Sequence, residues 1–122
     1  METVSLVGDK LAMYSGNDDQ IVPLMSLGGI GAISVLSNIL PAETVEICDR
    51  FFAGDIKGSA ALQCRYHALT NALFSEVNPI PVKAAMSAMG YGENSLRLPL
   101  TEMEKANEAV LLDLMRKAGL SV

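Results

Sequence analysis

The sequence has no tryptophan, one histidine and two cysteines, so it offers little material for common metal and redox sites. Neither Cys48 nor Cys64 lies in a Cys-x-x-Cys motif or a cluster of cysteines and histidines. We therefore predict two reduced thiols in a cytoplasmic protein, with no disulfide and no metal. His67, in the middle of an expected helix, is interpreted as a structural or surface residue.

Basic residues and long apolar runs are also scarce. Nine lysines and arginines face 14 acidic residues, giving a net charge of -5, which excludes the basic surface that a nucleic-acid binder or a polybasic membrane anchor requires. No apolar run approaches the ~20 residues of a membrane-spanning helix. The start METVSLVGDK lacks the basic and apolar regions of a secretory signal.

What the 122 residues do contain is ample apolar material, since 50% are hydrophobic, enough for one domain with a core. The pattern predicts a strand over Lys10–Ser15, a helix over Gln20–Leu27 and a strand over Ala32–Leu36. Asp18 or Asp19 can cap that helix. A strand–helix–strand unit of this length predicts parallel strands joined by a right-handed crossover.

The rest of the chain is expected to be helical, apart from a loop over Gly92–Leu100. A helix from Pro41 to Gly54 is followed by a long one that Asp55 caps and that reaches about Ser75. A rigid NPIP turn precedes a short helix that ends at Gly90, and Thr101 with Glu104 forms a capping box for the last helix. The predicted buried faces are Val45, Cys48 and Phe52; Leu62, Tyr66, Leu69 and Leu73; Val82, Ala85, Met86 and Met89; and Met103, Val110 and Leu114.

Two parallel strands do not form a stable sheet by themselves, because parallel sheets have several strands and both faces covered. Each strand would also have an open edge that can pair with another chain. The chain is therefore interpreted as a piece of a larger α/β fold, or as a protein whose partner chains complete its sheet.

Four segments together resemble one family: YSGND at 14–18, GGIGAISVLSN at 28–38, EVNPIPVK at 76–83 and LRLPL at 96–100. Their order and spacing are similar to those of the dihydrodipicolinate synthases (4-hydroxy-tetrahydrodipicolinate synthases), within the pyruvate-dependent aldolase superfamily. The resemblance covers the chain from about Leu11 onward.

The resemblance implies the C-terminal part of a (β/α)8 TIM barrel, a fold that typically needs ~250 residues. The two strands would resemble strands seven and eight. Residues 1–54 would form the last two β/α units, and residues 55–122 a C-terminal helical appendix. The family forms a lysine Schiff base with pyruvate and condenses it with L-aspartate 4-semialdehyde, in lysine and diaminopimelate biosynthesis.

The family resemblance also implies which parts of the site this chain holds. The Schiff-base lysine and the proton-relay tyrosine would lie before residue 1, so no catalytic residue is expected here and the chain alone should be inactive. Ile33 matches the position whose backbone carbonyl faces pyruvate, while Gly16 and Asn17 match the mouth of the site. Many relatives have SGDD where this chain has SGND, which puts the role of that carboxylate in doubt. No cofactor or metal is implied, and the family usually forms homotetramers.

Other interpretations remain open at this stage. Ile33 could be only a core residue, Gly16 could serve only a turn, and the SGND loop could bind phosphate at a helix N-terminus. Lys10 is expected at the wrong end of its strand, Lys83 in a surface ion pair, and Tyr14 in packing. The chain could also be a non-catalytic fragment that acts by association, or part of a related sugar-acid aldolase.

Overall fold

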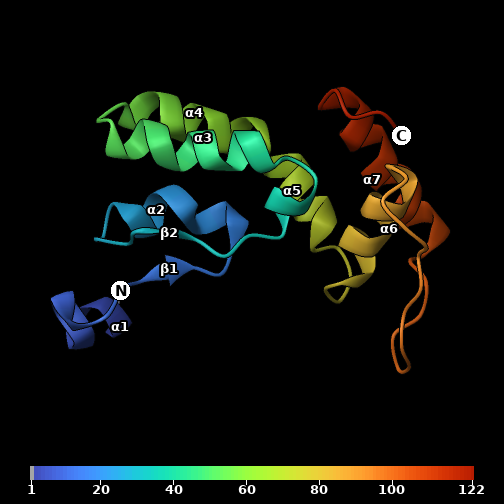
Figure 1. Ribbon diagram of the computed structural model, residues 1–122, viewed down its shortest axis with the longest axis horizontal. Helices are drawn as coiled ribbons and strands as arrows, with labels where there is room; N and C mark the ends of the chain where they lie inside the picture. The colour runs from blue at the N-terminus through green and yellow to red at the C-terminus, as the bar shows by residue number, and fades with distance from the viewer. Residues whose placement is uncertain (1) are drawn as a thin grey trace. The chain divides into compact units, whose positions relative to one another are not determined.

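The computed structural model describes residues 2–122, in which contacts define two compact units, Met1–Arg65 and Tyr66–Val122 (Figure 1). The first unit contains both strands, and the second is helical. The predicted division into residues 1–54 and 55–122 follows the family's barrel and appendix, and it stays a prediction. No helix in residues 2–122 has both the length and the apolar character needed to cross a bilayer.

The sheet of the first unit has two strands within residues 2–122, β1 (Tyr14–Ser15) and β2 (Gly31–Ala32). They are parallel, with Tyr14 opposite Gly31 and Ser15 opposite Ala32. Backbone bonds from Ile30 N to Met13 O (2.8 Å) and from Ile33 N to Ser15 O (2.7 Å) extend the ladder at both ends. The prediction of a parallel strand–helix–strand unit is confirmed.

Both strands are shorter than predicted, because turns occupy their outer ends. Lys10 lies in the 3-10 helix η1 (Gly8–Lys10) rather than in β1. Leu36 begins the 3-10 helix η3 (Leu36–Asn38), so the chain leaves the sheet soon after β2. The apolar run AISVL therefore supplies only one strand residue, Ala32, and the start of a turn.

The crossover between the strands is short and tightly closed. The 3-10 helix η2 (Asp18–Gln20) leads into α2 (Ile21–Met25), and neither has a side-chain cap, so the predicted capping of this helix by Asp18 or Asp19 is wrong. α2 ends at Met25, and Gly28, with φ of 96°, turns the chain back toward β2. That left-handed conformation suits glycine, which has no Cβ.

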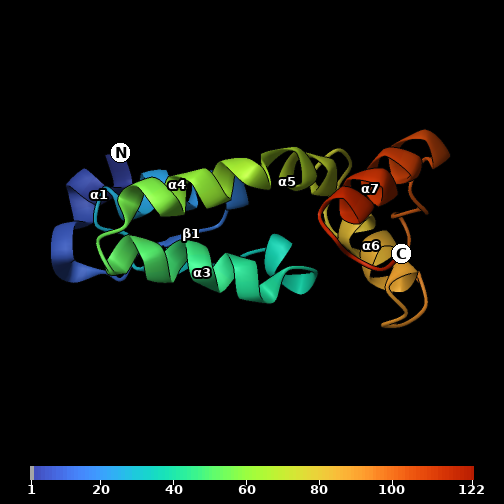
Figure 2. The same ribbon diagram turned by 90° about the horizontal axis from the view of Figure 1, so that it is seen from above.

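Helices cover one face of the sheet. α1 (Glu2–Val7) precedes η1, while α3 (Pro41–Phe52) and α4 (Ile56–Arg65) run side by side as a hairpin (Figure 2). Ile21 and Met25 of α2 and Ile47 of α3 form the buried core, with Ala32 of β2 packed against it.

The buried face of α3 differs from the predicted one. Thr44 and Ile47 are buried, whereas Val45 and Phe52 are 58% and 57% exposed and Cys48 is half-buried. The helix thus has apolar residues on two sides. Ile47 belongs to the core of this unit, with Cys48 and Phe51 packed against it, while Val45 and Phe52 stay exposed. Periodicity alone could not choose between them, because both sides follow the helical repeat.

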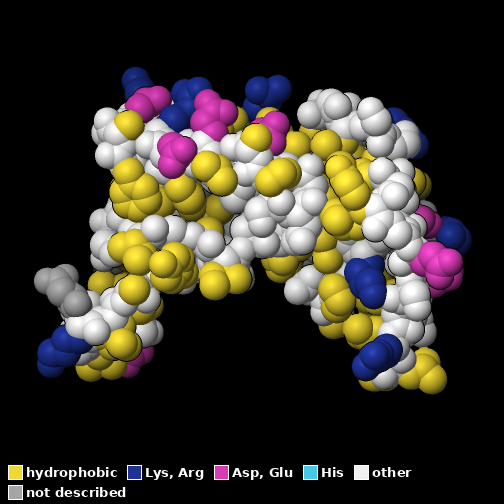
Figure 3. All heavy atoms as spheres, in the orientation of Figure 1, with side chains coloured by type: hydrophobic (Ala, Val, Ile, Leu, Met, Phe, Trp, Pro, Cys, Tyr) yellow, Lys and Arg dark blue, Asp and Glu magenta, His cyan; other side chains and the backbone are white. Residues whose placement is uncertain are grey.

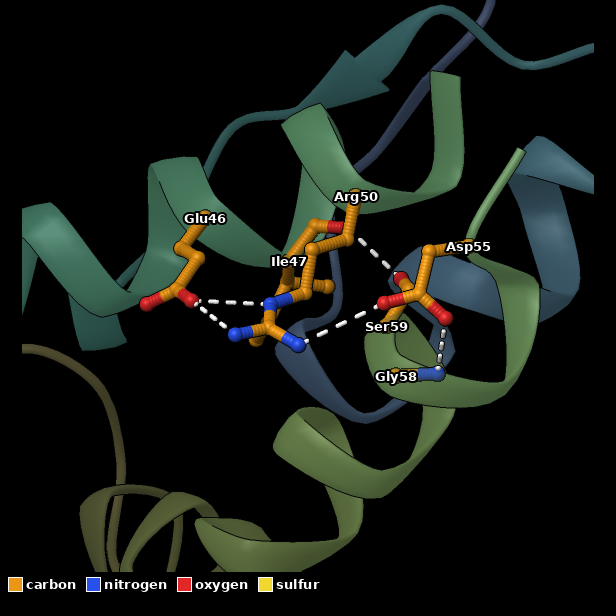
Figure 4. A network of polar contacts seen from close by, with 6 residues as sticks. All are labelled: Glu46, Ile47, Arg50, Asp55, Gly58 and Ser59. Carbon is orange, nitrogen blue, oxygen red and sulfur yellow. Dashed lines mark hydrogen bonds and ion pairs between the residues drawn. The ribbon is translucent and has the colours of Figure 1, made fainter. Parts of the chain in front are cut away.

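A polar network closes the turn between α3 and α4 (Figure 4). Asp55 Oδ1 accepts a bond from Gly58 N (2.9 Å), so the predicted cap at Asp55 is confirmed. The Arg50 guanidinium binds Glu46 within α3 and reaches Asp55 Oδ2 at 3.4 Å. These groups are exposed, so they fix the geometry of the turn more than they add to stability.

The second unit consists of α5 (His67–Leu73), α6 (Ile80–Ala88) and α7 (Lys105–Lys117), with both α5 and α6 packed on α7. The helix predicted to run from Asp55 to Ser75 is interrupted, since Tyr66 lies outside both helices that flank it. Its predicted stripe is nevertheless buried at Tyr66, Leu69 and Leu73.

The ends of α6 and α7 show one success and one error. α6 ends before Gly90, as predicted, with that glycine at φ of 83°. For α7 the predicted capping box is wrong, because the helix begins at Lys105 and Thr101 lies outside it. The buried residues around α7 are Met103, as predicted, and Leu111 and Met115 instead of Val110 and Leu114.

Candidate functional site

The candidate site lies where the two parallel strands end. Gly16 and Asn17 follow β1, and Ile33 follows β2, so the structure brings all three predicted residues to one edge of the sheet. The bond from Ile33 N to Ser15 O, at 2.7 Å, joins the two segments directly. Carboxyl ends of parallel strands are where α/β barrels hold their active sites.

One face of this edge is uncovered within residues 2–122. Ile33 is 72% exposed and Tyr14 is 50% exposed, while Ala32 on the alternate face packs against the helical core. Tyr14 also lies across Gly31, where a Cβ would meet the aromatic ring at 3.4 Å. Figure 3 shows hydrophobic side chains gathered at the surface around these strands.

The loop after β1 is ordered by its own serine. Ser15 Oγ donates to Asn17 O at 2.7 Å and accepts from Asn17 N at 3.3 Å. Gly16 is exposed, and a Cβ added to it would meet nothing within 4 Å. Because the protein fills none of the space above Gly16, a ligand can approach its backbone closely.

Asp18 is a residue whose place the sequence analysis missed. Its side chain is buried, with 2% exposure, and Oδ2 accepts bonds from Val35 N (2.9 Å) and Leu36 N (3.0 Å). Asp18 thus accepts hydrogen bonds from backbone N–H groups at the start of η3, in the loop after β2, rather than from the first turn of η2, to which it belongs. Its position as the second polar residue after SG was a visible signal, but only the strand pairing shows which backbone it reaches.

Gln63 of α4 also fixes the site loop, and no sequence signal pointed to it. Its Oε1 accepts from Val22 N (2.8 Å), and its Nε2 donates to Asp19 O (2.7 Å). Asp19 directly follows Asp18 in the chain, and Val22 lies in the first turn of α2. The loop after β1 is therefore tied to α4 as well as to the loop after β2.

No lysine lies at this edge among the described residues. Lys10 is in η1, and Lys83 of α6 donates to the carbonyl of Ser95 rather than pairing with a carboxylate, so its predicted ion pair is wrong. The hydrogen bond from Lys105 to Glu108 raises the pKa of Lys105, and the negative charge of Glu108 raises it further. A raised pKa opposes nucleophilic chemistry, because the attacking species is the neutral amine.

The phosphate-site alternative finds little support at the SGND loop. Two acidic residues, Asp18 and Asp19, open η2, and α2 has only five residues, so its end offers a weak positive pole.

The exposed His67 ring contacts Asn71 (Nε2 to Nδ2, 3.1 Å). Residues 2–122 hold no group of three His, Cys, Asp or Glu side chains that could bind a metal, and Cys48 and Cys64 are free thiols.

The fold is that of an α/β protein. It contains a parallel strand–helix–strand unit, with the candidate site at the carboxyl ends of its strands, and a second, helical unit. The Dihydrodipicolinate synthetase family matches residues 1–118, so the chain belongs to that family, as the four segments indicated.

Individual relatives agree with this assignment. The 4-hydroxy-tetrahydrodipicolinate synthase of Lachnoclostridium phytofermentans is 59% identical over 111 residues, covering 91% of this chain and 38% of the relative. That of Clostridium perfringens is 54% identical over 115 residues, covering 94% and 40%. The chain thus spans about 40% of the length of the curated relatives it matches.

Solved structures give the same result for the fold. Dihydrodipicolinate synthase from Aquifex aeolicus matches with a TM-score of 0.94 and 38% identity, covering 99% of this chain and 41% of that one. The enzyme from Thermotoga maritima matches with a TM-score of 0.90 and 39% identity, covering 94% and 39%. The predicted fold class, part of an α/β barrel with extra helices, is confirmed.

Proposed function

We propose that this chain is the C-terminal portion of a 4-hydroxy-tetrahydrodipicolinate synthase, a lyase that condenses pyruvate with L-aspartate 4-semialdehyde in lysine and diaminopimelate biosynthesis. The observation that carries the proposal is an identity of 54–59% to synthases over nearly the whole chain. The synthase name of these relatives favours this substrate pair over the sugar acids of related aldolases.

In this proposal the chain supplies one wall of the substrate site. The Ile33 carbonyl faces pyruvate, Gly16 permits close approach of the substrate to the backbone, and Asn17 lines the mouth. Their meeting at the carboxyl ends of β1 and β2 supports these roles. A carbonyl at the end of a strand is a good orienting group, because the sheet fixes its direction.

The chain alone is inactive in this proposal, since the Schiff-base lysine and the proton-relay tyrosine belong to the remainder of the enzyme. A Schiff-base lysine is activated by desolvation in an apolar pocket or by a neighbouring cation. Apart from Lys10, which lies in η1, the lysines lie on α-helices: Lys57 on α4, Lys83 on α6, and Lys105 and Lys117 on α7. Lys105 and Lys117 pair with Glu108 and Asp113 on their own helix.

The whole enzyme would have the organisation that the family resemblance implies. Residues 1–54 complete its barrel, residues 55–122 form its helical appendix, and the enzyme is a cytoplasmic homotetramer. The uncovered face at Tyr14 and Ile33, and the exposed Val45 and Phe52 on α3, are surfaces for the rest of the barrel to cover.

A chimaeric enzyme tests the substrate assignment. We define the chimaera as residues 1–122 joined to the part of the Lachnoclostridium phytofermentans relative that precedes its matched region. Assayed with pyruvate, it is expected to consume L-aspartate 4-semialdehyde and to leave sugar aldehydes unchanged. Activity confined to sugar aldehydes would contradict the assignment.

A further inference from the structure

The buried carboxylate of Asp18 connects the two loops of the candidate site. It follows Gly16 and Asn17 in the loop after β1, and its Oδ2 accepts bonds from Val35 N and Leu36 N in the loop after β2. Both bonds end on the same carboxylate oxygen, so Oδ2 joins two successive residues of the second loop to the first loop. At 2% exposure, solvent competes little with them.

These bonds constrain the Ile33 carbonyl in particular. On one side of that carbonyl, Ile33 N donates to Ser15 O at 2.7 Å. On the other side, Val35 N donates to Asp18 Oδ2 at 2.9 Å. The peptide units between the two anchors are planar, so few backbone dihedrals remain free to turn the carbonyl.

We propose that Asp18 is a positioning residue for substrate binding, which holds the Ile33 carbonyl in the direction that meets bound pyruvate. This rests on the proposed function, in which that carbonyl faces pyruvate. In this role Asp18 acts through its Oδ2 bonds to the backbone of residues 35 and 36. Asp18 also fixes the position of this carbonyl relative to Gly16 and Asn17, because it belongs to the loop after β1 and binds the loop after β2.

A purely structural cap predicts a different outcome. If Asp18 only stabilises η3, its loss lowers the amount or the melting temperature of the enzyme but leaves the pyruvate KM of the folded fraction unchanged. If it positions the carbonyl, the pyruvate KM rises in enzyme that is fully folded. KM does not depend on the active fraction, so the two roles can be separated even in a partly folded preparation.

The test compares Asp18→Asn with Asp19→Asn in the chimaera. Asp19 is the adjacent, exposed carboxylate, so its variant removes the same charge without touching the loop after β2. We expect Asp18→Asn to raise the pyruvate KM by about tenfold, because a small misplacement of an orienting group is costly. The KM for L-aspartate 4-semialdehyde should stay within about twofold, and Asp19→Asn should leave both unchanged.

Hydrogen exchange provides a readout that needs no activity. The peptide spanning residues 33–38 should exchange faster in Asp18→Asn than in the unsubstituted chimaera or in Asp19→Asn. Asp18→Glu, which keeps the charge, supports the proposal if it gives an intermediate KM, and it replaces Asp18→Asn if that variant does not fold. Unchanged pyruvate KM in a folded variant, or loss of folding in both Asp18 variants, would overturn the proposal.

Failure of the proposed function would look different. In that case the unsubstituted chimaera itself forms no adduct with pyruvate. The exchange comparison would still show whether Asp18 holds residues 33–38, and unchanged exchange in Asp18→Asn would then overturn the positioning role.

Discussion

Single residues of the first unit divide into those that shape the site and those that maintain the fold, and two glycines illustrate the two roles. A Cβ at Gly16 would meet nothing within 4 Å, whereas a Cβ at Gly29 would lie 2.9 Å from Leu24 O. Gly16→Ala in the chimaera should keep the melting temperature but raise the KM for pyruvate or for L-aspartate 4-semialdehyde about tenfold. Gly29→Ala should lower stability by about 1–3 kcal/mol with both KM values kept. A Gly16→Ala enzyme with unchanged kinetics would refute close approach at that residue.

The two thiols differ in their reactivity for reasons that are also local. Burial, and then the neighbouring charge of Asp49, raises the pKa of Cys48, so less of its thiolate exists at pH 8. Cys64 is exposed. A short pulse of iodoacetamide on the 122-residue chain, followed by peptide mass spectrometry, should label Cys64 first, with Cys48 labelling still rising above pH 9.

The control for the thiol experiment is the same pulse in urea, where the chain is unfolded and both cysteines should react at similar rates. Faster labelling of Cys48 than Cys64 in native buffer would contradict the burial of Cys48 in the first unit.

At this scale the site residues come from the family resemblance and their roles stay predictions, whereas the residues that support them were missed. Gly16, Asn17 and Ile33 were named because they match positions of the family that the chain resembles. Asp18 and Gln63 were not assigned their partners, since each bonds to backbone groups far along the chain, and only the folded register specifies these.

Elements show where capping depends on tertiary contact, and α7 is the clearest case. Glu76 Oε1 accepts from Glu104 N at 3.1 Å and from Asn107 Nδ2 at 2.8 Å, at the start of this helix. Glu76→Ala should destabilise the second unit by about 1 kcal/mol, measured by urea unfolding of the 122-residue chain. Thr101→Ala, the matched control, should have little effect, because Thr101 lies outside α7. A larger loss of stability in Thr101→Ala than in Glu76→Ala would support the capping box that the sequence suggested.

The elements themselves were largely predictable, while their buried faces were not. The strong helix signals at Pro41, Asp55 and Gly90 placed boundaries correctly because caps and glycine stops act locally. The faces of α3 and α7 were misassigned at Val45 and Val110, which are exposed in this chain. Sequence periodicity records every apolar face of a helix, including faces that another part of a protein would cover.

For the whole molecule the central observation is that residues 2–122 form a two-stranded parallel sheet with one uncovered face, in a chain spanning about 40% of its relatives' length. A parallel sheet of this kind is stable as part of a larger array. We therefore expect the reactive amine to come from the part of the enzyme outside this chain.

Borohydride trapping with pyruvate tests that claim most directly, using the 122-residue chain alone and the chimaera, each digested and mapped by mass spectrometry. The account predicts a pyruvate-derived mass increment only in the chimaera, on a lysine outside residues 1–122. The same increment on any lysine of the 122-residue chain would contradict it.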